Sequence, residues 1–388
     1  MKRANQLILT WSTAVIVCAL WSSPAAAMTV YEEGDRSVQV GAGIQVQYHL
    51  VEPEEGEETD EVIFRRLRPD LRARLGERWD GRVQLELGKA SGDNEVKVMD
   101  AWMRYKRGGL SVTVGSKKPP FSREFLTSSY QQQLVERTFV GDPNYGTPDR
   151  AIGIRLDGKT SGKRVAWAAM VASAGIDPDA GKVDFENPAN TEGDFNQGWL
   201  GAARLDLHPL GEVAYSQGDL ERGPFRFSLS LAGFAWSNDD DNNTYTDAAG
   251  RTTSSGKMDV DTADGVELSG AVRGGGFSLD VEYQLIRADS IDSGFSGGLF
   301  AGGTAELDKL AVEGGFMVMP GRMEVVGGYQ SIDADTYQDA WSRSAVGLNW
   351  FWNQHRTKLQ LTYRRGENLK GVSGNDADEA FLQLQLVF

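Results

Sequence analysis

The sequence predicts an all-β protein, a transmembrane antiparallel β-barrel of about sixteen strands. Three observations lead to this fold class. Apolar and polar residues alternate with a period of two in many segments, the connections between these segments alternate in length, and no apolar run after residue 27 approaches the ~18 residues of a membrane helix. Because a barrel strand needs an apolar residue only at every second position, the mean hydropathy of -0.39 fits a membrane barrel.

The first 27 residues have the pattern of a secretory signal peptide. An apolar stretch over 7–20 follows a positively charged start, and Pro24-Ala25-Ala26-Ala27 supplies a small-residue cleavage site. The stretch is too short for a retained membrane helix, which is the alternative. We therefore expect a signal peptide at 1–27 and an exported barrel domain at 28–388. Cys18, the only cysteine, lies in the signal peptide, so the exported chain should hold no disulfide.

The clearest alternating segment runs from Val38 to Leu50. Its apolar residues share one parity, and glutamine, glycine and histidine occupy the other. The segment is longer than a typical strand of a soluble sheet but fits a tilted strand that crosses a bilayer. Segments of this kind begin near residues 37, 62, 81, 97, 110, 150, 163, 197, 224, 259, 276, 308, 322, 340, 355 and 378. The twelfth is the least defined, because 294–307 is rich in glycine.

The connections between these segments fall into two alternating sets. One set is mostly short: 77–81, 107–109, 157–162, 273–275, 320–321 and 353–354, with 208–223 as the exception. The other is mostly longer and acidic: 51–61, 91–96, 117–149, 174–196, 238–258, 289–307, 333–339 and 366–377. This asymmetry is typical of an outer-membrane barrel whose termini both lie at the short-turn, periplasmic end. A soluble β-sandwich, the alternative, has no reason to keep it.

Aromatic residues occur near the predicted strand ends, where a membrane barrel carries aromatic girdles. They include Trp79, Trp102, Tyr105, Trp199, Trp236 and the run Trp350-Phe351-Trp352. The last strand ends in Phe388, and a terminal aromatic residue resembles the signal that is read by the outer-membrane assembly machinery. We therefore expect that machinery to be a partner of the last strand.

One predicted strand carries a row of positive charge. Its inward parity holds Arg66, Arg68, Arg72 and Arg74. The other parity is apolar and must face lipid, so the arginines face the lumen. Residues two apart on a strand lie about 6.6 Å apart, so the row spans roughly 26 Å. Arginine stays charged, and its planar fork fits phosphate and carboxylate groups. The alternative is that these arginines only pair with facing carboxylates such as Glu86.

Residues 117–149 form the longest connection and the third on the long side. The lumen of a sixteen-stranded barrel is wide, so we expect this loop to fold inward and narrow it. Lys117, Lys118 and Arg123 are its candidate anion-binding residues. An ordinary external loop is the alternative.

Several acids also have inward parity: Glu86, Glu267, Asp280, Glu282 and Glu324. They predict a mixed lumen with a basic side and acidic patches, so the basic row supports a preference for anions and not strict selectivity. Loss of Lys2 and Arg3 with the signal peptide would change the formal net charge from -15 to -17. An acidic chain is a poor candidate for binding nucleic acid.

Several motifs resemble the phosphate-selective porin O and P family. They are Phe64-Arg65-Arg66, Met99-Asp100-Ala101, the stretch 114–121, Thr127-Ser128-Ser129, Glu136-Arg137, 347–350 and 384–388. The resemblance implies a trimeric, sixteen-stranded porin whose third loop is folded inward, with Arg65 and Arg66 in an arginine-lined constriction. Simple alternation puts Arg65 outside, so an inward Arg65 requires a bulge or a position at the strand rim. The first strand offers glutamines and His49 where phosphate-specific members place an arginine.

The predicted function is passive diffusion of small anions, phosphate or polyphosphate among them, across the outer membrane of a Gram-negative-type bacterium. The predicted pore-lining residues are Arg65, Arg66, Arg68, Arg72, Arg74, Lys117, Lys118 and Arg123. Membrane lipid and lipopolysaccharide are the expected surroundings, and a homotrimer is the expected assembly. The alternatives are a general porin without anion specificity, a structural barrel or adhesin, and an outer-membrane hydrolase.

Enzymatic and metal chemistry have little support in the sequence. The three histidines lie in separate segments and the exported chain has no thiol, so we expect no catalytic site, cofactor or zinc site. Residues 239–243 resemble the first positions of a calcium-binding loop, but the glycine and the closing glutamate of such a loop are missing.

Overall fold

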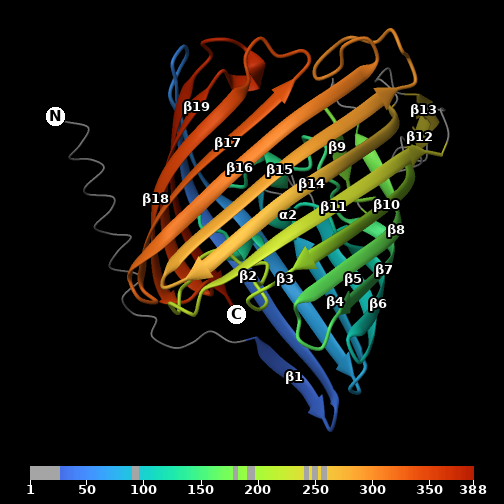
Figure 1. Cartoon of the computed structure of the whole chain (residues 1–388), viewed down its shortest axis with the longest axis vertical. Coiled ribbons are helices and arrows are strands. Elements are labelled where there is room, and N and C mark those ends of the chain that lie inside the picture. The colour runs from blue at the N-terminus through green and yellow to red at the C-terminus, as the bar shows by residue number, and fades with distance from the viewer. Residues whose placement is uncertain are drawn as a thin grey trace.

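Sixteen antiparallel strands close into a barrel in the computed structural model (Figure 1), which describes residues 27–89, 96–177, 182–189, 197–239, 244–246, 252–254 and 260–388. The first barrel strand pairs with the second along one edge and with the last along the other, so the sheet has no free edge within the barrel. Apart from Ala27, the predicted signal peptide lies outside the described residues.

The barrel strands follow the predicted order. They are β2 (Arg36–Pro53), β3 (Thr59–Leu75), β4 (Trp79–Glu86), β5 (Lys97–Arg107), β6 (Leu110–Lys117), β7 (Ala151–Lys159), β8 (Val165–Asp177), β10 (Gln197–Leu207), β11 (Arg226–Asn238), β14 (Val260–Gly274), β15 (Phe277–Ser290), β16 (Thr304–Met319), β17 (Met323–Ala334), β18 (Trp341–Asn353), β19 (Thr357–Glu367) and β20 (Ala377–Val387). Each begins close to its predicted start, and the uncertain twelfth is β16. The prediction of sixteen strands is therefore confirmed.

Four short strands lie outside this ring. β1 (Met28–Glu33) pairs with the start of β2, and β9 (Asp184–Glu186) pairs with the end of β8. β12 (Thr244–Thr246) and β13 (Thr252–Ser254) pair only with each other. Among the helices of the described ranges, none is long and apolar enough to cross a membrane.

The barrel strands expose many large apolar side chains on their outer face and bury polar side chains on their inner face, although apolar residues are also buried where the inner loop packs against the wall. Large apolar residues point outward, and Leu231, Leu268 and Val346 are each at least 60% exposed. Polar residues point inward, and Gln45 and Lys358 are 0% exposed. This arrangement suits a barrel that has lipid outside and polar groups inside.

Residues 118–150, hereafter the inner loop, pack against inward-facing side chains of the barrel. The segment contains the short helices α2 (Arg123–Leu126), η2 (Ser129–Gln131) and η3 (Phe139–Gly141). The side chains of Phe121, Phe125 and Phe139 are at most 1% exposed. Figure 1 shows α2 within the ring of strands.

Acids on the β14–β17 wall hold the inner loop. The backbone N–H of Ser122 donates to Glu267 Oε2 at 2.6 Å, and that of Glu124 donates to Glu282 Oε2 at 2.8 Å. These carboxylates compensate backbone donors that would otherwise be buried without partners. Two acids that sequence parity placed in the lumen are therefore covered by the inner loop.

Further along the inner loop, Gln133 Nε2 donates to Glu324 Oε1 at 2.7 Å. Lys358 Nζ donates to the carbonyl oxygen of Gln132, also at 2.7 Å. The inner loop is thus tied to β17 and β19 as well as to β14 and β15.

The connection 208–225 between β10 and β11 is the one long member of the otherwise short set of connections. It forms hydrogen bonds with the inner loop. The Gln217 N–H donates to the Gln131 carbonyl at 3.0 Å, and the Gln133 N–H donates to Gln217 Oε1 at 2.7 Å. Gln217 is buried. The extra length of this connection therefore allows it to support the inner loop from the short-turn end.

Candidate functional site

A cavity of about 620 Å³ remains between the inner loop and the wall that begins at β2. Its basic lining residues are Arg68, Arg72, Arg74, Arg82, Arg104, Lys106, Lys117, Lys118, Arg137, Arg150 and Arg155. Its acidic lining residues are Asp80 and Asp100. The excess of positive charge makes this cavity the candidate site.

A second cavity of about 370 Å³ adjoins the first. Both are lined by Arg72, Arg82 and Tyr130. The second also reaches the C-terminal Phe388, at the short-turn end of the barrel. Together, the two cavities, hereafter the basic passage, extend along the wall toward that end.

Three of the four predicted inward arginines on β3 line the first cavity: Arg68, Arg72 and Arg74. The side chain of Arg72 is 61% exposed, and its Nε donates to Asp70 Oδ1 at 3.1 Å. Arg68 pairs instead with Glu86, and its Nη1 donates to Ser129 Oγ at 3.0 Å. The alternative that wall arginines pair with carboxylates therefore applies to Arg68, and to Arg72 through Asp70 of the same strand.

A β-bulge at Arg65 explains the orientation of the arginine pair. Gln45 pairs with Arg66 while the next residue, Val46, pairs with Phe64, so Arg65 is an extra residue in β3. The bulge brings Arg65 to the inner face beside Arg66, because the two no longer alternate. Simple alternation, which placed Arg65 outside, is wrong at this position.

Arg65 and Arg66 nevertheless lie apart from the two cavities. Both nitrogens of an Arg65 fork donate to Glu136 of the inner loop, Nε at 2.7 Å and Nη2 at 2.9 Å. Arg66 is 3% exposed, and its Nη1 donates to Gln45 Oε1 at 2.7 Å. Neither residue is part of the lining of the basic passage.

The predicted loop residues divide between two sides of the barrel. Lys117 and Lys118 line the first cavity, and Lys118 Nζ donates to the carbonyl oxygen of Phe125. Arg123 lies elsewhere, because its Nε donates to Asp280 of β15 at 3.1 Å. The sequence analysis grouped Arg123 with the arginines of β3. In the structure, Arg123 is the first residue of α2 and lies against the acidic residues of β14 and β15.

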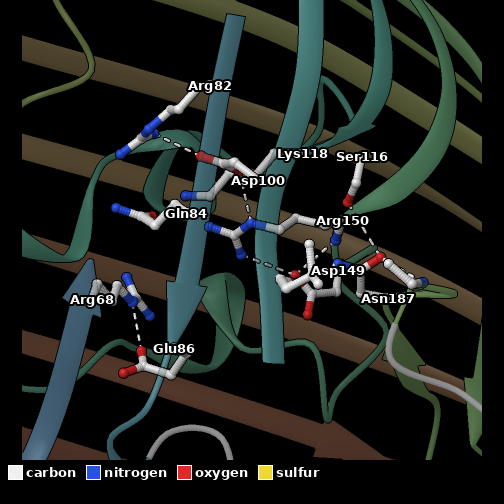
Figure 2. A network of polar contacts seen from close by, with 12 residues as sticks. Arg68, Arg82, Gln84, Glu86, Asp100, Ser116, Lys118, Asp149, Arg150 and Asn187 are labelled. Atoms are coloured by element: carbon white, nitrogen blue, oxygen red, sulfur yellow. Dashed lines mark hydrogen bonds and ion pairs between the residues drawn. The ribbon is translucent and has the colours of Figure 1, made fainter. Parts of the chain in front are cut away.

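Other arginines of the passage were missed as site residues. Arg82 bridges two acids, donating from Nε to Asp70 at 2.9 Å and from Nη1 to Asp100 at 2.6 Å. Arg150 Nε donates to the other oxygen of Asp100 at 3.0 Å, as Figure 2 shows. The inward parity of Arg82 on β4 was visible in the sequence. That of Arg104 on β5 could have been found in the same way.

Two tryptophans do not lie in the membrane girdles where strand-end position placed them. Trp102 lines the basic cavity, with Arg104 Cζ 5.1 Å and Lys117 Nζ 5.4 Å from its ring. Trp236 is 2% exposed, and its indole N–H donates to the Ala174 carbonyl at 2.8 Å. Both residues lie at inward-facing positions of their strands. Their side chains therefore point into the barrel, although the sequence analysis placed both residues near strand ends.

Burial affects two cations of the inner loop. It lowers the pKa of Arg137 to about 10, so this guanidinium remains charged at neutral pH. Burial and the neighbouring Arg137 lower the pKa of Lys118 well below its ordinary value. The arginines of the passage therefore keep their positive charge at neutral pH more firmly than Lys118 does.

Residues 38–197 match the family described as phosphate-selective porin O and P. The resemblance to this porin family is confirmed. The region includes the arginine row and the inner loop, and it covers less than half of the chain. A comparison with curated proteins gives no match.

Solved outer-membrane channels share the fold of this chain. An anion-selective porin from Comamonas acidovorans has 14% identity and a TM-score of 0.62, with 91% of this chain and 100% of that chain covered. OmpF of Salmonella typhi, in complex with daunomycin, has 12% identity and a TM-score of 0.59 over 92% and 100%. The channel DcaP of Acinetobacter baumannii has 10% identity and a TM-score of 0.58 over 94% and 100%.

Identities this low support the fold alone. The matching family model and the solved structures from Comamonas acidovorans and Acinetobacter baumannii are described as porins or outer-membrane channels. Among the described residues, no group of three or more histidine, cysteine and acidic side chains is arranged to hold a metal ion.

Proposed function

We propose that this protein is a porin through which small anions, phosphate-like ions among them, diffuse passively across the outer membrane of a Gram-negative-type bacterium. The observation that carries the proposal is the segregation of charge inside the barrel. Eleven basic and two acidic side chains line the open cavity, whereas Glu267 and Glu282 on the opposite wall bind the inner loop. A permeating anion therefore meets a positive wall.

The position of the inner loop supports a role as the constriction, which the sequence predicted for 117–149. The loop fills the lumen next to β14–β17 and leaves the passage along the β2–β7 side. A wide barrel would otherwise pass solutes with little discrimination.

General anion preference fits this geometry better than a specific phosphate site. Arg65 is already paired with Glu136, and Arg66 is buried against Gln45. The arginines that remain along the passage are distributed over β3, β4, β5, β7 and the inner loop, and they are partly offset by Asp70 and Asp100. Weak binding at several positions favours passage over retention.

The remaining proposals concern export and assembly. We propose that 1–27 is cleaved as a signal peptide and that the assembly machinery reads the last strand with Phe388. We also propose a homotrimer in contact with lipid and lipopolysaccharide. The trimer is supported by the likeness to OmpT of Vibrio cholerae in its trimer form, with 13% identity, a TM-score of 0.56 and 90% of this chain and 99% of that chain covered.

Reversal potentials in planar bilayers under a potassium chloride gradient test the proposed function. The unaltered porin should prefer chloride. The double variant Arg72→Ala/Arg74→Ala should lower the ratio of anion to cation permeability by roughly two- to fivefold, because a unit charge a few ångströms away contributes about 1 kcal/mol in water. Both arginines are exposed in the lumen, so their loss should leave the fold intact.

Arg287→Ala is the matched control, because Arg287 is an exposed arginine of β15 that pairs with Asp289 and lines neither cavity. Its permeability ratio should equal that of the unaltered porin. Cation preference of the unaltered porin, or an anion preference that the double substitution leaves undiminished, would contradict the anion passage. Folded protein without conductance would contradict the channel itself.

A further inference from the structure

The contact between Glu136 and Arg65 has the geometry of a bound anion. Two guanidinium nitrogens of Arg65 donate to the two carboxylate oxygens of Glu136 at 2.7 and 2.9 Å. This bidentate arrangement is the one in which arginine binds carboxylate and phosphate solutes. The side chains of Arg65 and Glu136 are 25% and 16% exposed, so the pair is within reach of water.

Two other cations surround the same carboxylate. Burial alone would raise the pKa of Glu136, but Arg65, followed by Arg66 and Arg364, holds that pKa well below its usual range. The Nε of Arg66 is buried, and within the described part of the chain it has no hydrogen-bond partner. Arg364 is engaged with Glu379 at 2.7 and 2.8 Å. Arg65 and Arg66 thus supply the donors, and Arg364 adds positive potential.

Other contacts fix the positions of Arg65 and Arg66. The bulge that turns Arg65 inward is fixed by Glu86, which accepts from the backbone N–H of Leu67 at 2.9 Å and of Gly88 at 3.0 Å. Arg66 is held by Gln45. The donors are therefore preorganised on the barrel wall, whereas Glu136 arrives from the inner loop.

We propose that Glu136 is a specificity-determining residue: it occupies, as a resident anion, an oxyanion site formed by Arg65 and Arg66. The inference rests on the proposed anion passage and adds to it. Arg65 and Arg66 do not line the two cavities, but the Arg65 side chain is 25% exposed, so a rigid pair without a resident carboxylate would retain multivalent anions and slow their passage. With Glu136 in place, the Arg65 fork is occupied and one of the two positive charges is compensated, so the passage keeps its more dispersed charges.

Removal of the resident charge should expose the site. Glu136→Gln preserves shape but loses the charge, so the Arg65 fork becomes available to a carboxylate or a phosphate. We expect inorganic phosphate to block chloride current through the Glu136→Gln porin at a concentration at least tenfold below that needed for the unaltered porin. The double variant Arg65→Ala/Glu136→Gln should lose this gain. An acetate titration in parallel separates carboxylates from phosphate as ligands.

Glu306→Gln is the matched control, because Glu306 is an exposed carboxylate of β16 that pairs with Arg287 and lines neither cavity. Calorimetric titration of the detergent-folded proteins with inorganic phosphate gives a readout that does not require conductance. It therefore separates failure of this inference from failure of the proposed channel. Heat-dependent mobility on gels shows whether each variant is a folded barrel.

Three results would overturn the inference. One is a folded Glu136→Gln porin that binds phosphate no better than the unaltered one. Another is a gain that persists without Arg65. The third is tight phosphate binding by the unaltered porin. If Glu136→Gln does not fold, Glu136→Asp serves in its place, because it keeps the charge but shortens the side chain, and it should show a smaller gain that also depends on Arg65.

Discussion

At the scale of residues, the most consequential side chain of the β3–β4 wall is Glu86. It is 0% exposed, and it accepts two backbone N–H groups at the bulge together with Nε of Arg68. A bulge leaves backbone groups without ladder partners, and a carboxylate that accepts them compensates for this loss. Gly88 allows the close approach, since a Cβ there would lie 2.7 Å from the Phe64 carbonyl oxygen. Glu86 therefore stabilises the bulge, and its paired carboxylate does not act as a free negative charge that would repel anions from the passage.

Gly43 allows the inner loop to lie against β2 and provides a test at this scale. A Cβ at Gly43 would overlap the ring of Tyr130. We expect Gly43→Ala to destabilise the barrel by about 1–3 kcal/mol through overpacking. The second substitution Tyr130→Ala should recover part of this loss, whereas Tyr130→Phe alone should be nearly neutral, because the buried hydroxyl has no partner in the described part of the chain. Thermal unfolding in detergent measures the series, and a Gly43→Ala protein of unchanged stability would contradict the packing argument.

At the scale of elements, the inner loop divides the charges of the lumen. Its first helix carries Arg123 to Asp280, and its backbone uses the carboxylates of Glu267 and Glu282. Its other side leaves the basic residues of β3–β7 open to the passage. The acids that argued against anion preference in the sequence thus serve to hold the loop.

The surroundings of Glu124 predict that the attachment of this loop depends on pH. Burial raises the pKa of Glu124 to about 7, although hydrogen bonds from Thr138 lower it. Glu282 and Glu313 on the wall and Asp142 in the loop add negative charge nearby, and Arg137 adds positive charge. A carboxyl with a raised folded-state pKa contributes stability below its unfolded pKa of about 4.5, and this stability is lost as the pH rises through about 7.

Glu124→Gln should remove this pH dependence. From pH 4.5 to pH 8 the unaltered protein should lose up to about 3 kcal/mol more stability than the variant, since one pKa unit corresponds to about 1.4 kcal/mol. Thermal unfolding in detergent at both pH values gives the difference, and Glu306→Gln should behave as the unaltered protein does. Equal pH dependence in the Glu124→Gln and unaltered proteins would show that Glu124 does not govern loop attachment.

At the scale of the whole molecule, net charge is a poor guide to the passage. The chain has a formal net charge of -15, yet basic residues dominate the open cavity. Acidic connections such as 51–61 are exposed at the long-loop end, and the remaining inward acids are covered or paired. The charge that a permeating ion meets is therefore opposite in sign to that of the protein.

This arrangement predicts that anion preference depends on ionic strength. The Debye length is about 10 Å at 0.1 M salt and about 3 Å at 1 M, so concentrated salt screens the arginines of the wall. At a constant gradient ratio, the anion preference should be strongest in dilute potassium chloride and should approach the mobility ratio of the ions in 1 M salt. Reversal potentials over a series of concentrations provide the measurement. A preference that does not change with salt would indicate selection by shape and not by fixed charge.

The amino-acid pattern alone was sufficient to predict the barrel strands and the inward row Arg68, Arg72 and Arg74. Lipid outside and polar groups inside impose a period of two that is legible in most strands, and β16 was recognised despite the glycine-rich stretch before it. The same rule failed for Arg65, because a bulge adds one residue and reverses the local parity.

Only the tertiary structure decided which inward charges face the passage. Glu136 lies 71 residues from Arg65, and Glu267 lies 145 residues from Ser122, yet these contacts withdraw one arginine and one acid from the open lumen. Sequence alternation determines which face of a strand a side chain occupies, because that depends on neighbours along the chain. Whether the side chain is free or paired depends on where a distant loop comes to rest, and this is set by closure of the barrel and packing inside it.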